Sequence, residues 1–512
     1  MNDLAEKALH GLDTARRQVG NRPVPAFASA GFLLAASIVV AGGRVGAATA
    51  TRPLSTWLGL QDAHVADTRG TLPGALLLAA VLALTVLWLV VVWFVRRHPQ
   101  PMRRMWLLAG AWAVPFAVGP PLLDTAVYGY ASYGLLQREG ADPYVSAPSS
   151  LGARDVVAAI DPGARGTPSA AGPLGTVLQH LAVSISSGSA LGAVLVLRAV
   201  AVLAVILLGV RAADLAEARR ADPDAGGRRD CALALTVLNP ALLLYVVSAA
   251  HLDGLLIALV VTALALAAQH RWLAGVIVAS LAGCLLGQGW LVAAVLVVAH
   301  WHVGRDRTRR HRTRAAVREV GVAVAIGAAA GFAVPHGFGW VTSVGQQFST
   351  HTPYSIAGGV SVVLAPVVRG ASYDDLAVGG RAAALIAMAC AVVYVVATAR
   401  RRPPELSAGG GLLAIALFAP SLFPWYLLWP AACYAPTANA GRRALVLVLG
   451  AGACVLAPSG FTPTAANVVT GVLLGVLAVA VATGVRLAPA GDLANRGADV
   501  GEVDGRDDDR DE

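Results

Sequence analysis

Acidic and aromatic side chains gather in a polar stretch that begins at Asp124, directly after the apolar run of residues 105–123. The stretch continues through Tyr128-Gly129-Tyr130 and reaches Asp142-Pro143-Tyr144. A carboxylate can accept a proton from a reacting hydroxyl, and a tyrosine can supply a ring and a hydrogen-bonding hydroxyl. Such groups at the mouth of a membrane span indicate a reaction site at the bilayer surface.

Other segments place polar or aromatic residues at the ends of apolar runs. They are the stretch from Thr167 to the Gly172-Pro173 turn, the pair His251 and Asp253 after Asn239-Pro240, the turn with Gln288 and Trp290, and the break Phe423-Pro424-Trp425-Tyr426. Ionisable groups at a bilayer edge are costly unless they are partnered or used. We therefore expect these segments to meet at one depth, on the outer side of the membrane.

The composition indicates an all-α integral membrane protein. Apolar residues make up 56% of the 512 positions and charged residues 13%, and stretches able to cross a bilayer recur between residues 26 and 487. The net charge of +9 does not indicate nucleic-acid binding, because the arginines lie in short clusters between apolar runs. These clusters instead predict which loops remain in the cytoplasm.

The alternation of basic and polar loops predicts about fourteen transmembrane helices, with a range of about 12–16, and both termini in the cytoplasm. Residues 1–25 form the expected cytoplasmic N-terminal segment, and residues 26–487 form the membrane domain. Within it, residues 124–187 are the first large extracytoplasmic loop, which we expect to be helical. Residues 488–512 are acidic and lack aromatic residues, so a disordered cytoplasmic tail is expected. No cleavable signal peptide is apparent.

Cysteine spacing and nucleotide-binding motifs give no sign of a metal site or a cofactor. The five cysteines all lie in apolar runs without metal-like spacing, which is typical of small packing residues. A Walker loop, a dinucleotide fingerprint and a zinc motif are missing from suitable contexts. Arg198 lies inside an apolar run, so it must face the helix bundle and find a buried partner such as a backbone carbonyl.

The order of these motifs resembles a known family. The matching segments run from Tyr128 to Tyr144, then Gly172-Pro173, Asn239-Pro240 with His251-Leu252-Asp253, Thr352-Pro353-Tyr354-Ser355, and Pro424-Trp425-Tyr426. In this order they are similar to the actinobacterial α-1,6-mannosyltransferases that use polyprenyl-phosphate mannose. Those enzymes are integral membrane glycosyltransferases of the C superfamily. The resemblance covers residues from about 101 to 487.

The resemblance implies a chemistry and its partners. A lipid-phosphate sugar enters from the outer leaflet, a mannan hydroxyl of a lipomannan or lipoarabinomannan type of lipoglycan attacks the anomeric carbon, and polyprenyl phosphate leaves with inversion. The reaction needs a carboxylate to accept the proton and donor groups to hold the phosphate. No further cofactor is expected.

The resemblance also implies roles for particular residues. Asp124 is the first candidate for the general base, and Asp253 is the second. His251 and Arg138 are phosphate candidates. The other substrate-binding candidates are Tyr128, Tyr130, Asp142, Tyr144, Gln288, Trp425 and Tyr426. Purely structural roles are the alternatives. Asp142 can shape the turn before Pro143. An interfacial aromatic belt can be formed by Trp425, Tyr426 and Trp429.

Several positions depart from the family pattern. The family carries an aspartate sixteen residues before the Asp-Pro-Tyr aspartate, and that position is Ala126 here. Because two residues turn a helix by about 200°, Asp124 can substitute only if its backbone is not helical. Gln288 stands where a lysine is expected, and Ala170-Ala171 replaces a Pro-Tyr pair. An inactive, transferase-like assembly subunit is therefore one alternative function, and a lipid-linked sugar transporter or flippase is another.

Overall fold

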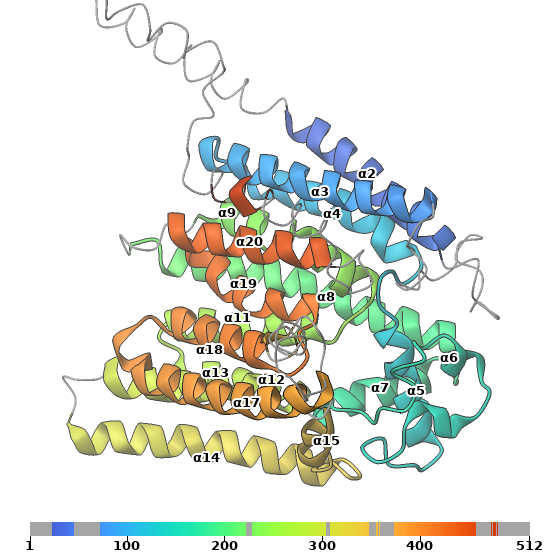
Figure 1. Ribbon diagram of the computed structural model, residues 1–512. Coiled ribbons are helices and arrows are strands. Elements are labelled where there is room, and N and C mark those ends of the chain that lie inside the picture. Colours follow the sequence, from blue (N-terminus) through green and yellow to red (C-terminus); the bar gives the residue numbers. More distant parts are fainter. Residues whose placement is uncertain are drawn as a thin grey trace, which may run out of the picture.

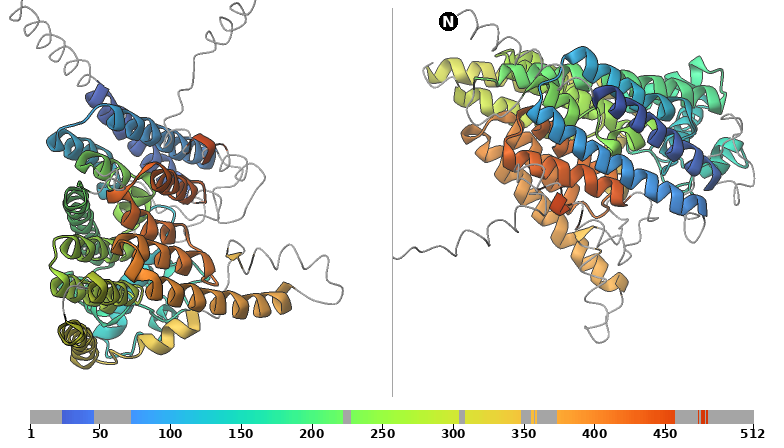
Figure 2. Two further views of the ribbon diagram at one scale, coloured as in Figure 1. Left: turned by 90° about the vertical axis from the view of Figure 1, so that its left-hand side faces the viewer. Right: turned by 90° about the horizontal axis from the view of Figure 1, so that it is seen from above.

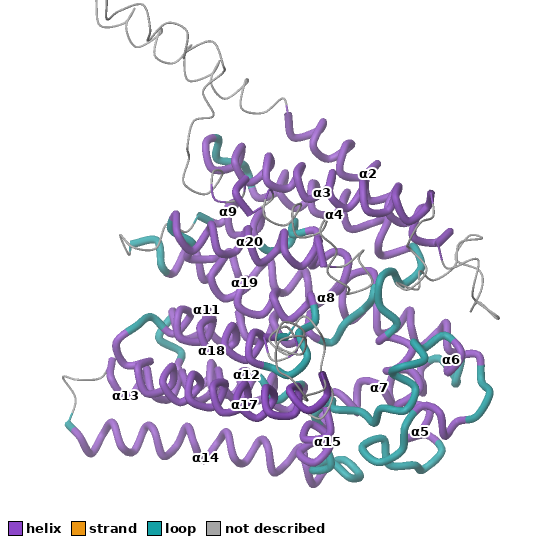
Figure 3. Tube along the Cα trace, in the orientation of Figure 1, coloured by secondary structure: helices purple, strands orange, loops and turns teal. Residues whose placement is uncertain are grey.

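The computed structural model describes residues 23–45, 72–221, 228–303, 308–347, 355, 356, 358, 373–456, 473, 475–477 and 479. Every regular element within these ranges is a helix, as the colouring of Figure 3 shows. The predicted all-helical class is confirmed for this part of the chain. Three segments discussed above lie outside the described residues: residues 1–22, the tail at 488–512, and Thr352-Pro353-Tyr354.

The helices up to the middle of the chain include the predicted helical loop. They are α2 (Pro23–Val45), α3 (Leu72–Arg97), α4 (Met102–Val118), α5 (Ala126–Arg138), η3 (Pro148–Leu151), α6 (Asp155–Ala158), α7 (Pro173–Ile185), α8 (Ala190–Ala218), α9 (Arg229–Leu235), α10 (Pro240–Leu242) and the π-helix η4 (Leu243–Ser248). Residues 124–187 thus contain α5, η3, α6 and α7, so the predicted helical character of this loop is confirmed.

The remaining helices follow in chain order. They are α11 (Asp253–Ala268), α12 (Trp272–Leu285), α13 (Gly289–Val303), α14 (Arg309–Ala333), α15 (Trp340–Gln347), α17 (Tyr373–Thr398), η5 (Ala399–Arg401), α18 (Pro404–Phe418), η6 (Pro424–Leu427), α19 (Leu428–Tyr434), η7 (Ala435–Thr437) and α20 (Ala440–Leu456).

The long helices run side by side as stacked rods (Figures 1 and 2). Helix α2 packs on α3 and α4, α8 packs on α11, and α12 pairs with α13 and with α11. Helix α14 forms one edge of the stack, and α5, α6 and α7 lie together at one end of the rods (Figure 1). Residues 124–187, which contain these three helices, therefore lie at that end of the bundle.

Five of the described helices are long and apolar enough to cross a membrane, or six if one bent pair counts as a single span. Other apolar helices are shorter: α12 has 14 residues and α13 has 15. At 1.5 Å per residue each covers only about 21–23 Å, less than the roughly 30 Å of a hydrocarbon core. The chain is a multi-pass membrane protein, but the predicted number of about fourteen spans is not confirmed.

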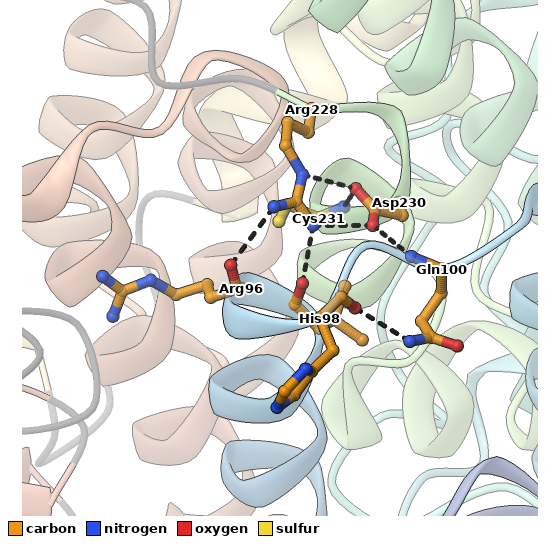
Figure 4. A network of polar contacts seen from close by, with 7 residues as sticks. Arg96, His98, Gln100, Arg228, Asp230 and Cys231 are labelled. Atoms are coloured by element: carbon orange, nitrogen blue, oxygen red, sulfur yellow. Dashed lines mark hydrogen bonds and ion pairs between the residues drawn. The ribbon is translucent and has the colours of Figure 1, made fainter. Parts of the chain in front are cut away.

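The bent pair consists of α9 and the α10–η4 segment, which meet at 56°. Asn239-Pro240 explains the break, because the Asn239 side chain accepts a hydrogen bond from the Ala241 amide and Pro240 begins the next helix. The start of α9 is held by Arg228, which donates to Val95 O, and by Asp230, which accepts from Gln100 N (Figure 4). The segment that leads to His251 is thereby attached to the end of α3.

Candidate active site

The backbone at Asp124 is not helical. This is the condition under which Asp124 can take the place of an aspartate at position 126. Leu123 has a left-handed φ of 65°, and α5 begins only at Ala126. Oδ1 of Asp124 accepts a hydrogen bond of 2.6 Å from the Ala126 amide. The carboxylate therefore lies at the N-terminus of α5, where the helix dipole favours a negative charge.

A second unusual turn carries His251. The π-helix η4 ends at Ser248, Ala250 has a left-handed φ of 53°, and α11 begins at Asp253. Both π-helical turns and left-handed non-glycine residues occur often at functional sites. The turn buries His251, whose side chain is 2% exposed.

The two turns bring Asp124, His251 and Asp253 together as a carboxylate–histidine cluster. Nε2 of His251 lies 3.2 Å from Oδ1 of Asp124, and Nδ1 lies 3.6 Å from Oδ2 of Asp253. The contact to Asp124 is a close charge contact without aligned hydrogen-bond geometry. Asp124 and His251 are 127 positions apart in the sequence, and the fold makes their side chains direct neighbours.

The environment of the imidazole favours its charged form. Burial by itself lowers the pKa of His251, but the negative charge of Asp124, followed by that of Asp253, raises it from 6.5 to about 9. His251 is therefore an imidazolium at neutral pH. The three groups together carry one net negative charge.

The two carboxylates differ in access and in bonding. The side chain of Asp253 is 8% exposed and that of Asp124 is 17% exposed. Oδ1 of Asp253 accepts a hydrogen bond of 2.8 Å from Nε1 of Trp429, while its Oδ2 faces His251. Both carboxylate oxygens of Asp253 therefore have a partner. The two contacts of Asp124, with the Ala126 amide and with His251, both involve Oδ1. Asp124 is the more exposed of the two carboxylates.

Aromatic rings surround the imidazole. Trp425 lies 4.2 Å from His251 between ring centroids, and Phe423 stacks on the other side of Trp425 at 4.8 Å. Tyr130 meets His251 edge to face at 6.4 Å. Tyr426 stacks on Trp429 at 4.2 Å. The structure therefore brings the predicted residues Tyr130, Trp425 and Tyr426 to the cluster or next to it.

Other predicted residues form a separate group. Oδ1 of Asp142 accepts from the Tyr144 amide at 2.9 Å, and its Oδ2 lies 3.3 Å from Nδ1 of His336. The Tyr144 hydroxyl lies 3.3 Å from that of Thr176. Asp142 does shape the turn at Pro143, and these contacts join it to the end of α14 and to α7 instead of to His251.

Three further candidates have different surroundings. Arg138 is exposed at the end of α5, with its guanidinium next to Gly188. Tyr128 is buried within α5. Oε1 of Gln288 is buried without a hydrogen-bond partner among the described residues. Gln288 follows α12, whose Leu285 carbonyl accepts from the Gly172 amide, so the Gly172-Pro173 turn lies beside this helix end.

Sequence reasoning missed two contributions to the cluster. Tyr245 in η4 lies 6.3 Å from His251 between ring centroids, but it reads as one more apolar residue of its run. The sequence assigns Trp429 only to an interfacial aromatic belt. Its spacing of four from Trp425 places both on one helical face, which is a signal for proximity but not for the bond to Asp253.

The bond from Trp429 can be tested through stability. Trp429→Phe keeps an aromatic ring but leaves Oδ1 of buried Asp253 without its donor. We expect the free energy of unfolding in detergent to fall by about 1.5–3 kcal/mol, the usual contribution of a hydrogen bond to a charged group. Trp88→Phe is the matched control, because Trp88 is equally buried and donates to the neutral carbonyl of Ala234. Equal losses in the two variants would contradict the special role of Trp429.

Comparison with known proteins gives consistent matches. A sequence profile described as "Alpha-(1->6)-mannopyranosyltransferase, N-terminal domain" matches residues 28–302, and one described as "MptB C-terminal domain" matches residues 354–487. Alpha-(1->6)-mannopyranosyltransferase A of Mycobacterium tuberculosis is 24% identical over 348 residues, covering 66% of this chain and 66% of that protein. Alpha-(1->6)-mannopyranosyltransferase B of Corynebacterium glutamicum is 26% identical over 360 residues, covering 64% of this chain and 58% of that protein. The chain thus spans 66% or less of the length of these two relatives.

Proposed function

The chain belongs to the alpha-(1->6)-mannopyranosyltransferase family, and from this membership we propose that it is a membrane mannosyltransferase. The donor is polyprenyl-phosphate mannose. The acceptor is an α-1,6-mannan of the cell envelope, of the lipomannan or lipoarabinomannan type. The reaction takes place at the outer face of the membrane, inverts the anomeric centre and uses no additional cofactor.

The observation that supports this proposal best is the carboxylate–histidine cluster. It offers one partly exposed carboxylate, Asp124, held 3.2 Å from a buried imidazolium. A general base must be reachable by the substrate and fixed in direction. Asp124 has both properties, because its contacts to Ala126 and His251 fix Oδ1 and leave Oδ2 for a substrate hydroxyl.

The chemical step follows from this arrangement. The acceptor hydroxyl oxygen forms a bond to the anomeric carbon of mannose as its proton passes to Oδ2 of Asp124. The bond between the anomeric carbon and the phosphate oxygen breaks, and polyprenyl phosphate leaves with the electron pair. Attack opposite to the leaving group inverts the configuration.

The surroundings suggest roles for the other residues. His251 is enclosed by two carboxylates and is 2% exposed, so we assign it to orienting Asp124 instead of to contact with phosphate. Tyr130 and Trp425 contact His251, and Tyr426 stacks on Trp429. Aromatic faces of this kind suit a sugar ring or a prenyl chain. Arg138 lies at the opposite end of the 13-residue α5 from Asp124, about 18 Å away at 1.5 Å per residue, so we assign it no contact with the phosphate.

The proposal is tested with the purified full chain in nanodiscs. Polyprenyl-phosphate mannose with a labelled, β-linked mannose is the donor, and an α-1,6-linked mannose disaccharide is the acceptor. We expect a labelled trisaccharide whose new linkage is α by NMR. Bound donor without any product would instead favour the inactive assembly subunit, and donor movement across the bilayer without product would favour the flippase.

A further inference from the structure

Arg198 is a buried charge in the first third of α8, and the cluster chemistry described above does not use it. Its side chain is 2% exposed on a helix that is otherwise apolar around it. A charge inside a membrane protein is expensive unless it is bonded or has a function. Its partners therefore indicate what it does.

The guanidinium group bonds to two different segments. Nη1 donates to the carbonyl of Gly119, directly after α4, and Nη2 donates to the carbonyl of Ser248 at 2.6 Å, at the end of η4. The same two segments also bond to each other, because the Ser248 hydroxyl donates to the carbonyl of Pro120 at 3.2 Å. Arg198 thus joins the segment that leads to Asp124 with the segment that leads to His251.

Each segment contains a strained residue just beyond these bonds. Leu123 lies between Gly119 and Asp124, and Ala250 lies between Ser248 and His251. A left-handed non-glycine residue costs of order 1–3 kcal/mol and persists only when its surroundings hold it. The hydrogen bonds of Arg198 and Ser248 hold the backbone just before the two left-handed residues, Leu123 and Ala250.

We propose that Arg198 is a positioning residue that sets the separation of Asp124 and His251 by holding the two backbone segments together. The inference rests on the proposed function, because it explains how the proposed base is kept in place. Arginine suits this task because its planar fork can bond to two carbonyls at once, whereas a lysine ammonium has a single nitrogen.

Arg198→Lys keeps the charge and removes the fork. We expect kcat for mannosyl transfer to fall by about 10–100-fold with little change in KM for the donor, since a displacement of about 1 Å can cost about 10²-fold. Arg219→Lys is the matched control. Arg219 follows the last turn of the same helix and pairs with buried Glu405 at 3.1 Å, remote from the cluster, so kcat should be unchanged.

A second readout does not depend on activity. An imidazolium quenches an indole in contact with it, and the ring centroids of Trp425 and His251 lie 4.2 Å apart. The protonation of His251 can therefore be followed by the fluorescence of Trp425, with His251→Gln as the blank. Among the residues that the structure describes, Asp124, Asp253, Tyr130 and Tyr245 are the titratable groups that face His251. When Asp124 moves away, the midpoint of this titration should shift from about 9 toward 6.5 in Arg198→Lys.

Ser248→Ala provides a test if Arg198→Lys does not fold, because it removes only the bond to Pro120. We expect a smaller shift of the His251 midpoint in the same direction. An unchanged midpoint in every folded variant would overturn the proposal. If the wild-type chain transfers no mannose, the proposed function fails, but the fluorescence titration still decides whether Arg198 positions the pair.

Discussion

Asp124→Asn should lower kcat for mannosyl transfer by about 10²–10⁴-fold while leaving KM for the lipid donor nearly unchanged. The amide has the size of the carboxylate, and its oxygen can still accept the hydrogen bond from Ala126. It cannot accept a proton from the acceptor hydroxyl at neutral pH. The loss should therefore appear in the chemical step, measured with radiolabelled donor under saturating acceptor.

The matched control for this prediction is Asp161→Asn. Asp161 lies in the same loop and makes the same local contact, since its Oδ1 accepts from the Gly163 amide at 2.8 Å, but it is exposed and has no bond to His251 among the described residues. Its kcat should stay within about twofold of wild type. Asp253→Asn should mainly cost stability, because Asp253 is buried. A larger loss of kcat in Asp253→Asn than in Asp124→Asn would move the base assignment to Asp253.

Sequence patterns predicted the helical class and several segments of the candidate site for clear physical reasons. Long apolar runs require helices in a membrane, because a helix satisfies its own backbone hydrogen bonds. Polar residues at the ends of such runs gather at one end of parallel rods. The meeting of Asp124, His251, Asp253 and Trp425 follows this logic.

The number of spans could not be obtained in the same way. Apolar composition does not distinguish a helix that crosses a membrane from a shorter helix packed inside the bundle. The region of α12 and α13 shows this, because both helices are apolar and neither reaches the length of a hydrocarbon core. The 56° bend between α9 and the α10–η4 segment adds a further ambiguity.

The direction of the key side chains was also beyond sequence reasoning. Asp124 can face His251 because Leu123 and Ala250 adopt left-handed φ angles, which these residue types rarely do. Asp142 and Tyr144 were expected at the site because they share its loop. Their contacts with His336 and Thr176 depend on how α14 and α7 pack, and no local pattern encodes that.

His251→Gln should lower the free energy of unfolding by about 3–5 kcal/mol at pH 6, because it removes the cation between two carboxylates and leaves buried Asp253 without it. Denaturant unfolding in detergent micelles measures this loss. His300→Gln is the matched control for the chemistry. His300 contacts the fully buried Glu319 at 2.6 Å, so this variant should also be destabilised but should keep its kcat, whereas His251→Gln should lose most of it.

The same substitution should remove a pH dependence. The pKa of His251 is raised from 6.5 to about 9 in the folded state. The folded protein therefore binds this proton more tightly than the unfolded chain does. The resulting stabilisation is fully present below about pH 6.5 and is lost as the pH rises through about 9, a change of about 3 kcal/mol. His251→Gln should flatten this part of the stability curve. A wild-type curve that stays level between pH 6.5 and 9 would show that the imidazole is not held as a cation between Asp124 and Asp253, and the orientation of the proposed base would then need another source.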